Sequence, residues 1–137
     1  HLDGFARWMM SQHQEEMAHA MRLFHYVLDR GGSVELDAIE KPQGQFDSVR
    51  AVFDAALQQE KQNTESIHQL YTLARSLDDF ATQSHLQWFL DEQVEEEKIF
   101  DEALGLLDLG KDDPSALLML NEKLGQRRGG DNPGGGA

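Results

Sequence analysis

Hydrophobic residues recur at intervals of three and four residues through three long stretches of the chain, and this period predicts α-helices. The first helix should run from Leu2 to Arg30 and end at Gly31-Gly32. Its predicted inward positions are Phe5, Met9, Gln12, Glu16, His19 with Ala20, Leu23 and Val27. Residues 31–47 show no clear period, so we expect a long crossover connection there.

The second and third stretches predict two long helices that form an antiparallel pair. Residues 47–48 offer two capping side chains for the second helix, and the third should span residues 80–109. The break at residues 76–79 is short enough for a hairpin. Inward positions of the second helix are Val49, Phe53, Ala56, Glu60, Asn63, Ile67, Leu70, Ala74 and Leu77. Those of the third are Thr82, Leu86, Phe89, Gln93, Glu96, Phe100, Ala103 and Leu107.

The end of the chain predicts a short helix and a tail. Asp113 and Pro114 suit the cap and first turn of a helix that ends near Gln126. Residues 127–137 are Gly-rich and should form a flexible tail, which leaves residues 1–126 as one helical domain.

Three long helices and a short one are an unusual set for a bundle. Helices of about 30 residues are about 45 Å long and need neighbours along that length. Aromatic and aliphatic residues also lie off the predicted seams, namely Trp8, Phe24, Trp88 and Ile99. We therefore expect a fourth long helix, absent from these 137 residues and preceding His1, to complete an all-α four-helix bundle.

Three carboxylates interrupt the apolar seams near the middle of their helices. They belong to Glu16, Glu60 and Glu96, and no Lys or Arg falls among the predicted inward positions. A buried charge is normally paired or bound to a metal ion. His19 follows Glu16 by three residues on the same helical face, although such a pair alone is also typical of a solvated surface. Together these residues favour bound Fe, Mn or Zn, with Glu16 as the bridge between two ions.

Further polar residues surround the three carboxylates. Asn63 and Gln93 lie at the same level and suit supporting roles around metal ligands. Glu15 flanks Glu16, and two acidic residues, Glu92 and Glu95, flank Glu96. These three flanking residues form either a looser cation site or an ordinary solvated face, and Glu97 should face solvent.

The composition narrows the functional classes. Twenty-five acidic residues against 12 Lys and Arg give a formal net charge of −13, which disfavours nucleic acid and anionic membranes as partners and attracts cations. The absence of cysteine excludes disulfides and thiolate ligands and leans towards the cytoplasm. No apolar run is long enough for a membrane span, and no phosphate-binding loop or nucleophile elbow occurs. Methionines at 9, 10, 17 and 21 favour core and interface packing over haem ligation.

Three segments, at residues 2–24, 58–62 and 86–98, resemble the second, third and fourth helices of prokaryotic non-haem ferritins. They read LDGFARWMMSQHQEEMAHAMRLF, QQEKQ and LQWFLDEQVEEEK. The resemblance covers residues 2–126 and implies a ferritin-like four-helix bundle with a short C-terminal fifth helix, the first long helix being absent from this chain. Residue 99, three after Glu96, is Ile rather than His, which matches the non-haem branch and implies no haem.

The resemblance also implies roles for individual residues. Glu16 resembles the ligand that bridges a di-iron ferroxidase centre, and His19 resembles the imidazole ligand of its first iron. Glu60 and Glu96 resemble ligands of the second iron, and Gln93 and Trp88 match residues beside the centre. The three flanking residues Glu15, Glu92 and Glu95, with Glu96, resemble a third iron site. The family's first long helix supplies a further Glu to the first iron, and that residue is not in this sequence.

We therefore expect an iron-storage ferritin that oxidises Fe(II) with O2 or H2O2 and mineralises the product. The resemblance implies a homo-oligomeric cage of 24 subunits, with the short helix from Pro114 lining a channel. Two alternatives stay open. One is a non-catalytic structural or nucleating subunit, which the incomplete first-iron site favours. The other is a di-iron or di-manganese peroxidase, which the missing second E-x-x-H motif disfavours.

Overall fold

The computed structural model describes residues 2–110 and 113–126, and every regular element in them is a helix. The four helices are α1 (Asp3–Asp29), α2 (Val49–Ser76), α3 (Phe80–Leu109) and α4 (Pro114–Leu124). Three long helices and a short one are therefore confirmed. A complete four-helix bundle with a fifth helix is not contained in these residues, which hold four helices in total. The predicted tail, 127–137, lies outside the described residues.

The chain divides into two compact units. One unit holds α1, the connection up to residue 42, and α4. The other holds α2 and α3 within residues 43–110. Residues 31–46 form no helix or strand, as expected, but the predicted crossover and the single domain 1–126 concern the relative placement of the units and stay predictions.

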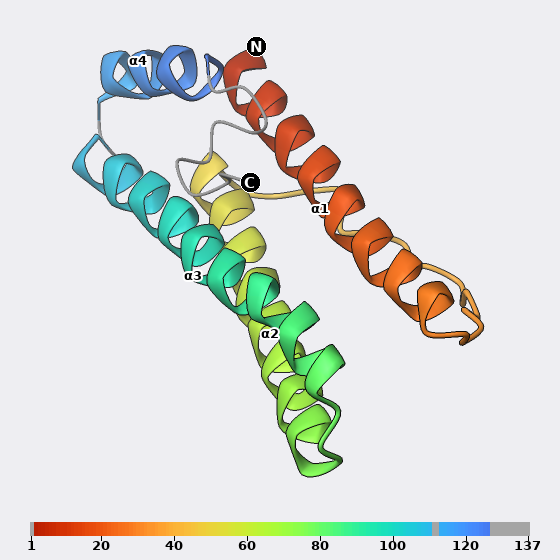
Figure 1. Cartoon of the computed structure of the whole chain (residues 1–137). Coiled ribbons are helices and arrows are strands. Elements are labelled where there is room, and N and C mark those ends of the chain that lie inside the picture. Colours follow the sequence, from red (N-terminus) through yellow and green to blue (C-terminus); the bar gives the residue numbers. More distant parts are fainter. Residues whose placement is uncertain (1, 111–112, 127–137) are drawn as a thin grey trace. The chain divides into compact units, whose positions relative to one another are not determined.

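Helices α2 and α3 lie side by side and antiparallel, as the hairpin prediction requires (Figure 1). Ser48 caps α2 by accepting from the amide of Ala51 at 3.1 Å. Asp79 caps α3 by accepting from the amide of Thr82 at 3.0 Å. Between the helices, Asp78 adopts a left-handed conformation with φ 53°, which Asp tolerates better than most residues. The caps and this turn therefore define where the hairpin reverses.

An ion pair joins α2 and α3 at the opposite end of the hairpin. Arg50, near the start of α2, forms an ion pair with Asp108 near the end of α3 and another with Asp54. The pKa of the Arg50 guanidinium is raised. Its hydrogen bond to Asp108 is the largest cause, and the negative charges of Asp108 and Asp54 add to it. These groups are exposed, so the ion pairs contribute little to stability.

All of the predicted inward positions of α3 are buried or half-buried, and those of α2 only in part. The rings of Phe53 and Phe100 meet edge-on across the two helices, with centroids 6.3 Å apart. On α2 the prediction is wrong for Leu70, which is 45% exposed, and for Leu77, which is 70% exposed. Both lie towards the turn, where fewer residues of α2 are buried than the four-three period predicts.

On α1 the covered face differs from the predicted seam. Phe5 and Gln12 are buried as predicted, but Trp8, which was placed off the seam, is 1% exposed and buried with them. These three residues are spaced by three and four, so the covered face is centred one residue before the predicted position at Met9. The later seam positions Ala20 and Val27 are exposed. Met10, Met17 and Met21 are exposed, so they do not pack in the core of the described residues, and the interface packing also expected of them stays a prediction.

Helix α4 meets the first turn of α1 (Figure 1). Leu2 provides no side-chain cap for α1. Instead, Asn121 of α4 accepts hydrogen bonds through Oδ1 from the amides of Gly4, at 2.9 Å, and Phe5, at 3.1 Å. A Cβ added to Gly4 would overlap the carbonyl oxygen of Asn121. Gly4 is therefore the residue that lets α4 come close enough to cap α1.

Replacing Gly4 by Ala should destabilise this contact by about 1–3 kcal/mol, because the added methyl group overpacks it. Gly105→Ala is the matched control, since Gly105 is also helical and a Cβ there meets nothing within 4 Å. The control should be neutral or stabilising by up to about 1 kcal/mol. Urea unfolding followed by circular dichroism measures both variants. Equal stability of the two would show that α4 does not hold Gly4 in solution.

Candidate metal centre

Glu60 is a buried carboxylate on α2 that two amides hold in place. Its residue is 5% exposed, as is Gln93 on the facing helix α3. Gln93 donates through Nε2 to the backbone oxygen of Glu60 at 3.1 Å and to its Oε2 at 3.4 Å. Asn63, one turn along α2, donates through Nδ2 to the same Oε2 at 3.2 Å. Amide donors are neutral, so they orient this carboxylate without cancelling its charge.

Glu96 is the second buried carboxylate of this unit and is 2% exposed. It follows Gln93 by one helical turn on the same face of α3, and the other buried residues of that helix are apolar. Two ionisable carboxyl groups in the interior of a helical hairpin are costly unless something compensates their charge. Burial of this kind is what the sequence pattern predicted for both residues.

Two residues that sequence reasoning missed extend the network around Glu60. Gln93 also donates to Oγ1 of Thr64 at 3.1 Å, and Thr64 donates in turn to Oε1 of Glu97 at 2.6 Å. Glu97 is half-buried, so it is partly open to solvent as expected, and it also accepts a hydrogen bond across the helix pair. The only available signal was the position of Thr64, one turn after Glu60, because the bond to Glu97 depends on how the two helices meet.

Glu16 and His19 form the second group, on α1. Nδ1 of His19 lies 3.2 Å from Oε1 of Glu16, and the side chains are 14% and 36% exposed respectively. Glu16 is therefore less buried than its seam position predicted. Either nitrogen of an imidazole can bind a metal ion, and a carboxylate beside the ring is common at metal-binding histidines.

The three flanking residues are half-buried, and the structure places them on both units. Glu15, on α1, accepts a hydrogen bond from Nε2 of Gln12 at 2.8 Å. Glu92 and Glu95 lie one turn apart on α3, beside Glu96. Each unit thus gathers its own acidic group, and the union of the two groups into one centre stays a prediction.

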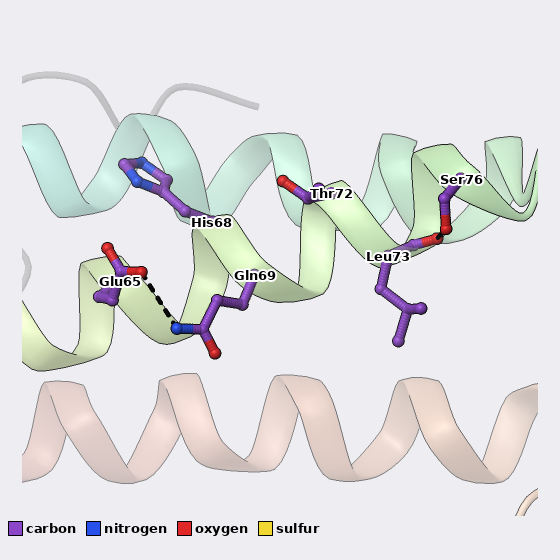
Figure 2. A pocket seen from close by; sticks show the side chains of 6 residues that line it. All are labelled: Glu65, His68, Gln69, Thr72, Leu73 and Ser76. Atoms are coloured by element: carbon purple, nitrogen blue, oxygen red, sulfur yellow. Dashed lines mark hydrogen bonds between the residues drawn. The ribbon is translucent and has the colours of Figure 1, made fainter.

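A separate hollow on α2 contains none of the predicted site residues. Figure 2 shows its lining, which comes from this one helix and in which Gln69 donates to Glu65 at 3.0 Å. All of the lining residues are exposed; they are Glu65, His68, Gln69, Thr72, Leu73 and Ser76. One imidazole and one carboxylate in solvent make a poor ligand set compared with the buried group around Glu60.

The donor chemistry of the two acidic groups fits a hard or borderline metal ion. Buried carboxylate oxygens with one imidazole suit iron, manganese or zinc, and the sequence has no thiolate to offer a softer metal. The amides around Glu60 supply the outer hydrogen bonds that orient metal ligands in proteins.

None of the described helices combines the length and the apolar character that crossing a membrane requires.

The sequence of this chain is similar to those of known ferritins. Residues 1–110 match the ferritin-like domain. The bacterial non-heme ferritin of Staphylococcus aureus (strain USA300) is 38% identical over 125 residues, which are 91% of this chain and 75% of that protein. The protein of the same name from Staphylococcus epidermidis is 39% identical over the same shares of the two chains.

Solved structures agree with the sequence relatives. An open pore ferritin from the hyperthermophilic archaeon Archaeoglobus fulgidus is 42% identical, with a TM-score of 0.91 over 93% of this chain and 78% of that one. The match spans both units and therefore includes the segments that carry both acidic groups. The chain belongs to the ferritin family and is similar to the non-haem ferritins of bacteria.

Proposed function

We propose that this protein is an iron-storage ferritin with ferroxidase activity, for which Fe(II) is the substrate. The observation that carries the proposal is the pair of buried carboxylates, Glu60 and Glu96, on facing helices, with Glu60 oriented by neutral amides. A hairpin that only had to fold would be more stable with apolar residues there. The carboxylates therefore have a use that outweighs their effect on stability, and binding cations is the chemistry they suit.

In this proposal each acidic group supplies part of a di-iron centre. Glu16 bridges the two iron ions and His19 ligates the first of them. Glu60 and Glu96 bind the second, and Gln93 stands beside it. A third, looser iron site takes the flanking residues Glu15, Glu92 and Glu95 together with Glu96. The ions reach both groups from solution, and the net charge of −13 favours their approach.

The reaction is an electron transfer from iron to an oxygen species. Each Fe(II) gives up one electron, so two ions at one centre reduce O2 with two protons to H2O2. With H2O2 as the oxidant, the same two electrons and two protons give two molecules of water. Fe(III) is then hydrolysed and stored as a ferric oxyhydroxide mineral. The role of the protein is to bring the ions together and to hold carboxylates that favour the higher charge of the product.

The finer architecture is also part of the proposal. A long helix from outside these residues would complete a four-helix bundle, and residues 1–126 would form one domain of it. Such subunits would assemble into a homo-oligomeric cage of 24 chains in the cytoplasm. Support comes from one face of α1, where Met10, Met17 and Met21 are exposed at helical spacing and would be covered in an assembly.

A non-catalytic structural or nucleating subunit is the second candidate. It is favoured by the group on α1, where the described ligands are Glu16 and His19 and the former is 36% exposed. A first-iron site with so few ligands would bind iron without fast turnover. A peroxidase of the same fold class has no observation of its own to support it. The experiments below separate storage with oxidation from binding alone.

The first experiment measures cation binding without redox chemistry. Zn²⁺ should raise the free energy of unfolding, by about 2.7 kcal/mol at 100 times its dissociation constant. Glu96→Gln should lose most of this stabilisation because it removes a buried anionic ligand. Glu122→Gln, an exposed site on α4, is the matched control and should respond like the wild type. Thermal melts with chelator and with Zn²⁺ give the comparison. A wild-type response from the Glu96 variant would place the cation elsewhere.

The second experiment measures oxidation. Anaerobic loading with Fe(II) followed by air should give a rapid rise in ferric absorbance equivalent to about two irons per chain, as a di-iron centre requires. Glu16→Ala should slow this phase by at least the roughly 10–100-fold that loss of a supporting residue costs at metal sites. The variant should still fold, because the change relieves an acidic cluster. If it oxidises iron as fast as the wild type, Glu16 is not the bridge. Slow colour in the wild type would favour the non-catalytic subunit.

A further inference from the structure

A chain of hydrogen bonds leads from Glu60 to the edge of the α2–α3 hairpin. It runs from the Glu60 carboxylate to the Gln93 amide, then to the Thr64 hydroxyl and on to the Glu97 carboxylate. All four residues belong to one compact unit. Exposure increases along the chain, from Glu60 and Gln93 at 5% each to Thr64 and Glu97, which are half-buried. The network thus connects a buried acidic residue to a carboxylate nearer the solvent.

The direction of each bond in this chain is determined by chemistry. An ionised carboxylate only accepts hydrogen bonds, so Thr64 must use its single proton for Glu97, and the 2.6 Å distance is typical of a hydroxyl bonded to a charged acceptor. The hydroxyl oxygen then has only lone pairs to offer Gln93. Gln93 must therefore present its NH2 group, rather than its carbonyl oxygen, to Thr64.

This constraint decides which way the Gln93 amide faces. Its NH2 group has two protons, and the acceptors around it are Thr64 and the two oxygens of Glu60. A flipped amide would set its carbonyl oxygen against the carboxylate of Glu60 and the lone pairs of Thr64. Three acceptors would then face one another in a buried site, which is strongly unfavourable. Glu97 and Thr64 therefore hold Gln93 in the orientation that lets it donate to Glu60.

We propose that Thr64 and Glu97 are positioning residues of the ferroxidase centre, which act through Gln93 to fix the Glu60 carboxylate for iron. The inference rests on the proposed function, because it needs a cation at Glu60. Both Gln93 and Asn63 donate to Oε2 of Glu60, so this carboxylate is oriented before any ion arrives. A ligand oriented in advance loses less entropy when it binds, which is how supporting hydrogen bonds raise metal affinity.

The alternative is that Thr64 and Glu97 merely tie α2 to α3. A tie of that kind would affect unfolding but not the properties of a bound ion. The test therefore uses Co²⁺, whose visible absorption spectrum reports the geometry of its ligands, together with Fe(II) oxidation. The Co²⁺ spectrum reports binding and Fe(II) oxidation reports catalysis. Both are measured on the full chain.

Thr64→Val removes the hydroxyl group and preserves the shape of the side chain. It should weaken Co²⁺ binding by about 10- to 100-fold, change the Co²⁺ spectrum and lower kcat for Fe(II) oxidation. Thr64→Ser keeps the hydroxyl group and should restore all three properties. Thr72→Val is the matched control, since Thr72 lies on α2 with its side chain in the exposed hollow, and it should behave like the wild type.

Glu97→Ala provides a second variant that removes only the outer acceptor. Thr64 can then turn its proton towards Gln93, so the orientation of the Gln93 amide is held by Glu60 alone and is less strictly fixed. The spectrum should broaden and binding should weaken, by less than in Thr64→Val. This variant also keeps the proposal testable if Thr64→Val is too unstable to study.

Three results would overturn the proposal. One is wild-type Co²⁺ affinity and spectrum in Thr64→Val and Glu97→Ala. Another is a Thr64→Ser variant that binds Co²⁺ as poorly as Thr64→Val, because the hydroxyl group would then not be what positions Gln93. The third is a wild-type chain that binds no Co²⁺. A wild-type chain that binds Co²⁺ but oxidises Fe(II) slowly would refute the ferroxidase activity alone, and the Co²⁺ series would still decide the role of Thr64.

Discussion

The register in which α2 and α3 pair is the constraint on which the candidate centre depends. Gln93 reaches both the backbone and the side chain of Glu60 only when these residues lie opposite each other. The edge contact between Phe53 and Phe100 and the short turn beyond Ser76 hold that register from both directions. A slip of one helical turn, about 5.4 Å, would separate Gln93 from Glu60 and remove the hydrogen bonds between the two helices at this level. Loss of hydrogen bonds to a buried carboxylate is costly, so the core and the polar network select the same pairing.

The hairpin combines a conventional core with residues that oppose its stability. Apolar side chains above and below the centre of α3 are almost fully buried, and Glu96 lies among them. Neutral amides from Asn63 and Gln93 orient Glu60 while leaving its charge intact. A charged carboxylate in the interior lowers the stability of the fold, but it strengthens the binding of a cation that can reach it. The binding role proposed for this unit follows from that opposition.

Ligands of the proposed centre come from both compact units. The group on α1 contributes an imidazole and a carboxylate, and the group on the hairpin contributes buried carboxylates. A metal ion held by both would add its binding free energy to the association of the units. Cation binding and the assembly of the fold would then be linked, as is common where ligands are distant in sequence. The hydrogen-bond network that ends at Glu97 lies within one unit, so its geometry does not depend on that association.

The local structure of this chain was determined by its sequence alone. Helical periodicity, capping residues such as Ser48 and Asp113, and the break before Phe80 predicted the four helices to within about two residues. The inward face of α3 was predictable as well, because large apolar residues on both sides of Gln93 and Glu96 share one helical face and are buried together.

Tertiary structure decided the features that depend on a neighbour. Periodicity shows which residues share a face, but only packing shows how far along a helix that face is covered, as the buried Trp8 and the exposed Leu77 demonstrate. The cap that Asn121 gives to α1 joins residues more than 100 positions apart. The bond from Thr64 to Glu97 likewise exists only in the register that the hairpin adopts. Hydrogen bonds between helices need distances and directions that a one-dimensional pattern does not contain.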